Sequence, residues 1–135
     1  IGLAVAQPEK RVLVITGDGE LLMGLGSLTA AAAEGLPNMA IAVIDNERYG
    51  ETGQQQTVTG RGADLTAIAA ASGFGTIKLV TEEADIDAGV DLCRNATGPV
   101  LVTFKVSADP LPMVLPPKDG AYLKSRFREA VVGKI

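Results

Sequence analysis

Residues 11–46 read RVLVITGDGELLMGLGSLTAAAAEGLPNMAIAVIDN, and this stretch decides the fold. It begins with a continuous apolar, β-branched run at 11–16 and closes with a second at 39–45, both typical of parallel strands covered on both faces. The apolar residues between them recur at helical spacing: Leu21, Leu25, Leu28 and Ala32. They predict a helix from Glu20 to Gly35, ended by glycine and Pro37. We therefore expect a βαβ unit with two neighbouring parallel strands.

The rest of the chain continues this alternation of strands and helices. We expect a helix at 64–72 capped by Asp64, a strand at 76–80, a helix at 82–95, a strand at 99–106 and an amphipathic helix at 121–132. Four strands with helices between them predict an α/β fold, in which helices flank a mostly parallel sheet in three layers. The polar segment 46–62 has no clear apolar period, and an unstructured segment of that length is usually functional or disordered.

The two ends of the chain differ from this central pattern. Residues 1–6 resemble the last turns of a helix that has no start signal, which predicts a fold truncated at its N-terminus. We expect an α/β module at 1–107 and a Pro-rich arm with a helix at 108–135. The arm carries four prolines and four neighbouring apolar residues: Pro110, Pro112, Pro116, Pro117, Leu111, Met113, Val114 and Leu115. Its apolar side chains favour packing against a neighbouring subunit or domain.

Composition excludes several classes of function. The 135 residues carry 12 basic and 16 acidic side chains without a basic stripe, so we expect no nucleic-acid partner. No histidine and a single cysteine leave no intrachain zinc site, Cys-His or Ser-His nucleophile pair, or disulfide. Cys93 lies on a helical apolar stripe and is predicted to be a buried structural thiol. With no membrane-length apolar run and no signal peptide, we expect a cytoplasmic location and no membrane contact.

Polar residues follow the first two predicted strands at their carboxyl ends. Gly17-Asp18-Gly19 ends the first strand and Asp45-Asn46 ends the second. Neighbouring parallel strands lie about 4.8 Å apart, so Asp18 and Asn46 can meet at one edge and share a hard cation such as Mg²⁺. The helix expected to open at Glu20 directs its free N–H groups there, which suits a phosphate. Gly17 and Gly19 are expected to allow a tight turn and close approach of a ligand.

The GDG motif, a spacer and an Asn together resemble the C-terminal, diphosphate-binding module of thiamine diphosphate enzymes. The resemblance runs from GDGELLMGLGSLTAAAAEGLPN to AIAVIDNERYG and covers nearly the whole chain. It implies that Asp18 and Asn46 bind Mg²⁺ through their side chains and Arg48 through its backbone carbonyl. The residues implied to bind the cofactor are Gly17, Asp18, Gly19, Glu20, Leu21, Asn46, Arg48, Tyr49 and Gly50. The Gly-rich helix start that such modules place upstream is absent from these residues.

Within that family, the segments GDGELLMGLGSL and DNERYGETGQQQT are most similar to decarboxylases of sulfopyruvate and phosphonopyruvate. This implies a small 2-oxo acid substrate with a second anionic group and a thiamine diphosphate cofactor that supplies the electron sink. The family's activating glutamate belongs to a separate pyrimidine-binding module, so the catalytic residue is expected outside this chain. The resemblance thus implies a fused or separate partner module in a homo- or hetero-oligomer. An acetolactate synthase-like carboligase module and a non-catalytic α/β assembly module remain the alternatives.

Several further side chains have two readings. Tyr49, Gly50, Glu51, Thr52 and residues 54–57 lie on a segment that closes over the cofactor in the family, or form a solvated loop. Arg48 and Arg61 are candidates for the substrate's sulfonate or phosphonate, or are surface cations. Met23 is predicted to belong to the core, with a possible second role against the cofactor rings. Asp45 is predicted to cap the turn after its strand rather than bind the metal.

Overall fold

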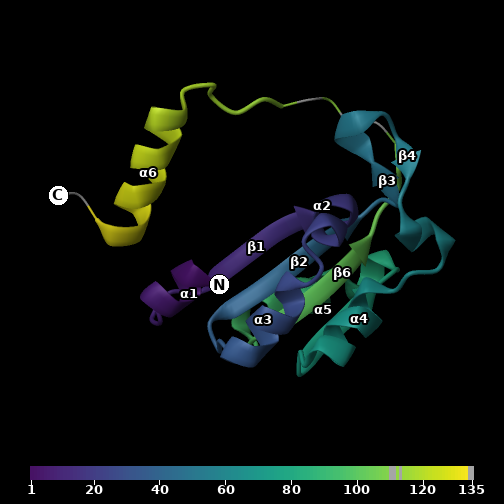
Figure 1. The fold of residues 1–135 in the computed structure, drawn as a ribbon, viewed down its shortest axis with the longest axis horizontal. Coiled ribbons are helices and arrows are strands. Elements are labelled where there is room, and N and C mark those ends of the chain that lie inside the picture. The colour runs from purple at the N-terminus through teal and green to yellow at the C-terminus, as the bar shows by residue number, and fades with distance from the viewer. Residues whose placement is uncertain (110–111, 113, 134–135) are drawn as a thin grey trace.

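The fold is built on one four-stranded parallel sheet, seen in a computed structural model that describes residues 1–109, 112 and 114–133 (Figure 1). The strands are β1 (Val12–Gly17), β2 (Met39–Asp45), β5 (Thr76–Val80) and β6 (Val100–Lys105). Their order across the sheet is β1-β2-β6-β5, and every neighbouring pair is parallel. The prediction of a flanked parallel sheet with β1 beside β2 is confirmed.

The register brings the carboxyl ends of the three strands β1, β2 and β6 to one edge. Gly17 at the end of β1 pairs with Ile44, and Asp45 at the end of β2 pairs with Lys105 at the end of β6. Residues that directly follow β1 and β2 therefore emerge side by side at this edge, because parallel strands run in the same direction.

Helices cover both faces of the sheet, which gives three layers. On one face pack α2 (Asp18–Met23), α3 (Ser27–Glu34) and α4 (Leu65–Ser72), and on the other packs α5 (Ile86–Asn95). Alternate residues of β2 serve the two layers: Ile41 and Val43 join the first core cluster, whereas Ala40 and Ala42 join the second. The β2 run is continuously apolar because both of its faces are buried.

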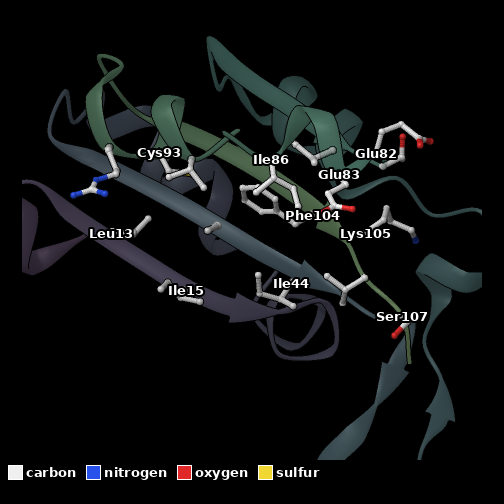
Figure 2. A pocket seen from close by; sticks show the side chains of 16 residues that line it. Leu13, Ile15, Ile44, Glu82, Glu83, Ile86, Cys93, Phe104, Lys105 and Ser107 are labelled. Carbon is white, nitrogen blue, oxygen red and sulfur yellow. The ribbon is translucent and has the colours of Figure 1, made fainter. Parts of the chain in front are cut away.

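The prediction that the first strand is covered on both faces is wrong for β1. This strand lies at the edge of the sheet, and Ile15 remains 68% exposed. Beside α5, the sheet forms one wall of an apolar groove of about 920 Å³, which Figure 2 shows from close by. Leu13, Ile15 and Ile44 line this groove on the sheet side, and Ile86 and Phe104 line it near α5. An apolar run in the sequence shows that a strand can be buried, but not that it is. Here α5 is too far from β1 to cover this part of the sheet.

Two predicted helices are divided. The helix expected from Glu20 begins earlier, at Asp18, and is interrupted between α2 and α3, where Gly24 and Gly26 flank Leu25. Glycine destabilises a helix interior, which explains the break. The predicted C-terminal end is confirmed, because Gly35 adopts a left-handed conformation with φ of 58°. The helix expected at 82–95 becomes a 3₁₀ turn, η3 (Glu83–Asp85), followed by α5.

The polar segment 46–62 is not an unstructured loop. It contains a short antiparallel hairpin of β3 (Arg48–Tyr49) and β4 (Gln55–Gln56). The 3₁₀ turn η1 (Gly50–Thr52) joins these strands, and a second turn, η2 (Val58–Arg61), follows them. Figure 1 places the hairpin beyond the carboxyl ends of the sheet strands.

The two ends of the chain pack differently: Ala4 near the N-terminus joins the first core cluster, whereas the C-terminal helix lies outside the three layers. The predicted N-terminal helix is present as α1 (Gly2–Ala6), and the C-terminal one as α6 (Gly120–Val132). No residue of α6 is buried, and the helix lies away from the sheet in Figure 1. Of the arm, Pro110, Leu111 and Met113 fall outside the described residues, while Val114 and Leu115 are exposed. No helix in the described part of the chain is long and apolar enough to cross a membrane.

Candidate functional site

The candidate site lies at the carboxyl edge of the sheet, where β1 and β2 end. Asp18 follows β1 as the first residue of α2, and Asn46 directly follows β2. Because Gly17 pairs with Ile44, both residues leave the sheet at the same level. The predicted meeting of these two chain segments at one edge is therefore present in the fold. Figure 1 shows the β3–β4 hairpin beyond this edge, and α2 contacts β3.

Asp18 is buried, with 1% of its surface exposed, and is held by two threonine hydroxyls. Thr57 Oγ1 donates to Asp18 Oδ2 at 2.6 Å, and Thr59 Oγ1 lies 3.1 Å from the same oxygen. Both contacts use Oδ2, which leaves Oδ1 available to another ligand. Among the described residues, no lysine or arginine forms an ion pair with Asp18. A carboxylate buried without a positive partner is costly, so this position favours a bound cation.

The segment after β2 arranges two further oxygen atoms. Asn46 Oδ1 accepts the backbone N–H of Arg48 at 3.0 Å and keeps a second lone pair. The backbone N–H of Thr57 donates to the Glu47 carbonyl at 3.0 Å, so residues 47 and 57 form a hydrogen-bonded pair. Pairs alternate along an antiparallel ladder, and the next pair, Arg48 with Gln56, turns the Arg48 carbonyl away from β4. That carbonyl is therefore free of the ladder.

These donors fit a hard cation such as Mg²⁺. The edge offers a carboxylate oxygen, an amide oxygen and a backbone carbonyl, the oxygen ligands that Mg²⁺ prefers. Within the described ranges no group of three or more His, Cys, Asp or Glu side chains could hold a metal. In addition to Asp18, a cation at this edge would therefore rely on Asn46, on the Arg48 carbonyl and on the oxygens of its own ligand.

The two glycines around Asp18 have different reasons to be glycine. Gly17 has φ of −83°, which any residue adopts, and a Cβ there would meet only the Ile44 carbonyl at 3.9 Å. The expected tight turn is therefore not what requires glycine at this position. At Gly19 a Cβ would lie 2.6 Å from the ring of Tyr49, so the aromatic ring fills the space that glycine leaves. Gly19 thus permits α2 to pack against β3.

The remaining residues predicted to bind the cofactor occupy varied surroundings. Leu21 packs its side chain in the core, so only its backbone is left to face a ligand. Glu20 is exposed and accepts the Thr16 hydroxyl at 2.6 Å. Gly50 is exposed at the start of η1. Met23, predicted to belong to the core, is instead 79% exposed, because α2 ends there and its side chain points away from the sheet layer.

Asp45 caps the turn after β2, as predicted, and also joins an ion-pair network. Its Oδ1 accepts the Glu47 N–H at 3.1 Å and lies 2.9 Å from the Thr59 hydroxyl. Its Oδ2 pairs with Lys105 Nζ at 3.2 Å, and Lys105 also pairs with Glu47. Burial lowers the pKa of Lys105, but the hydrogen bonds and charges of Glu47 and Asp45 outweigh this effect and leave the pKa raised. Lys105 therefore stays charged beside Asp45.

Thr59 and Lys105 were missed by the sequence analysis, and Thr57 was noted only as part of the polar segment. The available signal for the threonines is their spacing, since Thr57 and Thr59 stand two residues apart, as on one face of an extended chain. Lys105 ends a strand that follows β2 only after the intervening β5, so its place beside Asp45 depends on sheet order. Of the two candidate arginines, Arg48 donates to the Glu47 carbonyl and Arg61 is exposed, and their role toward a substrate anion stays a prediction.

Comparison with known proteins identifies the family. Residues 1–104 match the model of the thiamine pyrophosphate enzyme, C-terminal TPP binding domain. The chain belongs to this family. As a solved structure, a transketolase from Campylobacter jejuni aligns to 71% of this TPP-binding chain and 15% of its own, with a TM-score of 0.54 and 20% identity. At that identity the likeness establishes the fold and nothing further.

Curated relatives of this chain include decarboxylases and an acetolactate synthase. Sulfopyruvate decarboxylase subunit beta of Methanocaldococcus jannaschii is 45% identical over 78 residues, which cover 57% of this chain and 42% of the relative. Phosphonopyruvate decarboxylase of Streptomyces viridochromogenes is 35% identical over 97% of this chain and 33% of its own length. Acetolactate synthase isozyme 1 large subunit of Escherichia coli is 33% identical over 86% of this chain and 22% of its own. The chain thus spans less than half the length of each.

Proposed function

We propose that this chain is the thiamine diphosphate- and Mg²⁺-binding part of a decarboxylase that acts on a small anionic 2-oxo acid of the sulfopyruvate or phosphonopyruvate type. The observation that carries the proposal is Asp18, a buried carboxylate with no basic partner among the described side chains, at the carboxyl edge of the sheet. In open α/β sheets ligands bind at this edge. Membership of the TPP-binding family supports thiamine diphosphate as the cofactor, and a divalent cation at this edge would balance the negative charge of its diphosphate.

In this proposal the chain's residues bind and orient, and the cofactor provides the reactivity. Asp18 Oδ1, Asn46 Oδ1 and the Arg48 carbonyl would hold Mg²⁺. Bound thiamine diphosphate supplies an electron sink for loss of CO₂ from a 2-oxo acid. The Tyr49 ring packs over Gly19, next to Asp18, and so holds the hairpin against the start of α2. No acid or base is assigned within this chain.

A partner module completes the proposed active site. Three relatives of this chain carry the name sulfopyruvate decarboxylase subunit beta, which supports a partner subunit for them. For this chain we propose a pyrimidine-binding partner, fused or separate, that brings the activating glutamate.

Isothermal titration calorimetry on the full protein with its partner tests the binding function. Titration with Mg²⁺ and thiamine diphosphate should give saturable binding, and Asp18→Ala should abolish it because the cation loses its carboxylate. Asp87→Ala removes the same charge from an exposed position on α5 and should leave binding unchanged. Absence of binding by the assembled protein, or intact binding by Asp18→Ala, would overturn the proposal and favour a non-catalytic module.

The carboligase reading is the second candidate, because the acetolactate synthase relative aligns over 86% of this chain. Product analysis separates the two. The decarboxylase should release CO₂ from sulfopyruvate or phosphonopyruvate, whereas a carboligase should form acetolactate from pyruvate alone. Acetolactate as the main product would replace our proposal with this second one.

A further inference from the structure

Two buried threonine hydroxyls hold one oxygen of the Asp18 carboxylate. Thr57 is fully buried and Thr59 is 7% exposed, and their hydroxyls lie 2.8 Å from each other. Both come from the segment after β4, while Asp18 begins α2. The carboxylate is therefore fixed by a part of the chain that is distant in sequence.

Each threonine hydroxyl has a single proton to donate, and the distances indicate which oxygen accepts it. Thr57 has one proton, and its shortest contact is Asp18 Oδ2 at 2.6 Å, so the proton goes there. Thr59 has one proton for three neighbours: Thr57 Oγ1, Asp18 Oδ2 and Asp45 Oδ1. Asp45 already has the Lys105 ammonium group and the Glu47 N–H. Apart from Thr57, Asp18 has no donor among the described residues, so the Thr59 proton is shared between Asp45 Oδ1 at 2.9 Å and Asp18 Oδ2 at 3.1 Å.

This asymmetry fixes the orientation of the carboxylate. With Oδ2 facing the two hydroxyls, Oδ1 is the oxygen left for a ligand. Lys105 neutralises Asp45 on the far side of Thr59, so the network does not supply its positive charge to Asp18. Groups behind the ligands of a metal orient those ligands in this way.

We infer that Thr57 and Thr59 are positioning residues, which hold Asp18 Oδ2 so that Oδ1 faces the cation. The inference rests on the proposed function, in which Asp18 binds that cation. Through the same contacts, the hydroxyls attach the segment at 46–62 to the cation site. The end of this segment is therefore a fixed support beneath the site, while residues 50–56 remain exposed.

Cation affinity of the full protein with its partner tests the inference without measuring turnover. Mn²⁺, followed by electron paramagnetic resonance in the presence of thiamine diphosphate, serves as the probe. Thr57→Val should weaken Mn²⁺ binding by about 10- to 100-fold, the usual effect of losing a group that orients a metal ligand. Thr57→Ser keeps the hydroxyl and should retain the affinity. Thr59→Val should weaken binding less, because its contact with Asp18 is longer and its proton is shared.

Thr66→Val is the matched control. Thr66 is also a buried threonine, and its hydroxyl donates to Thr103 at 3.0 Å in the core rather than to Asp18. Its thermal unfolding midpoint should fall like that of Thr57→Val, but its Mn²⁺ affinity should stay unchanged. If Thr57→Val does not fold, Thr59→Val and Thr57→Ser carry the comparison.

The possible outcomes separate this inference from the proposed function. Equal losses of affinity in Thr57→Val, Thr57→Ser and Thr66→Val would overturn it, because the effect would then be general destabilisation. Unchanged affinity in Thr57→Val and Thr59→Val, with binding lost in Asp18→Ala, would also overturn it while leaving the proposed function intact. Unchanged affinity in Asp18→Ala would overturn both.

Discussion

The two ends of the sheet use polar side chains in opposite ways. At the amino end, Arg11 donates to the carbonyls of Leu92, Cys93 and Ala96 at the end of α5, and to that of Pro37. The two N–H groups of the Asn38 amide lie within hydrogen-bond distance of three carbonyls around α1: Ala4, Gln7 and Lys10. At the carboxyl end, Asp18 meets hydroxyls but no positive side chain among the described residues.

We infer from this difference that the amino end of the sheet serves mainly stability and the carboxyl end serves mainly binding. The amino end satisfies backbone carbonyls with fixed donors, so its groups have internal partners. The carboxyl end keeps a buried negative charge that the described protein groups only orient. We therefore expect substitutions at the amino end to change the free energy of unfolding with little effect on cation affinity. The predictions below test this separation, beginning with the largest expected effect.

Gly98→Ala should cause the largest loss of stability. A Cβ at Gly98 would collide with the backbone carbonyls of Leu36 and Met39 at the amino end of β2, which cannot move without disturbing the strand. We expect the free energy of unfolding to fall by about 3 kcal/mol. Urea denaturation measures it. Gly75→Ala is the control, because a Cβ there meets nothing within 4 Å, and a comparable loss in both variants would contradict the explanation.

Arg11→Ala should cost about 2 kcal/mol, since hydrogen bonds from a charged group to three backbone carbonyls at the end of α5 are lost. Arg94→Ala removes an exposed arginine from the last turn of the same helix and should cost about 0.5 kcal/mol. Denaturation curves of both variants provide the comparison. A loss of Mn²⁺ affinity in Arg11→Ala as large as that in Thr57→Val would show that the two ends are not independent.

Gly19→Ala tests the packing of α2 against β3 at the carboxyl end of the sheet, without changing any charge. The added methyl group meets the Tyr49 ring, which must move, and we expect a loss of about 1 kcal/mol. The loss should largely vanish when Tyr49→Ala is also present. A double-mutant cycle by thermal unfolding measures this coupling. Additive effects of the two substitutions would mean that the ring does not determine the need for glycine.

The last prediction concerns the Cys93 thiol, which should react only slowly with a thiol reagent in the native protein. Burial raises the pKa of its thiol, and the opposing effect of the nearby Arg11 is smaller. Because the thiolate is the reactive form, the native thiol should react slowly at pH 8 and faster as the pH rises toward the raised pKa. Mass spectrometry of iodoacetamide-treated protein measures the modified fraction. Rapid modification of the native protein, equal to that in urea, would contradict the burial of Cys93 between α5 and the sheet.

Local sequence signals predicted the elements well where the cause is local. Asp64 caps α4 by accepting the N–H groups of Thr66 and Ala67, and this cap was predicted from its position alone. The break at Gly24 was missed because the apolar spacing continued through it. The open face of β1 was missed as well, since an apolar run is the same whether a helix covers it or not.

The candidate site likewise has features that local sequence predicts and features that depend on the tertiary structure. The sequence by itself determined that Asp18 and Asn46 leave neighbouring parallel strands at one edge, because a βαβ unit fixes both their direction and their adjacency. Only the tertiary structure decided the surroundings of Asp18. Thr57 and Thr59 reach it after a hairpin, and Lys105 reaches Asp45 because β6 lies between β2 and β5. Such contacts depend on sheet order and on the path of the chain, which periodicity and spacing do not encode.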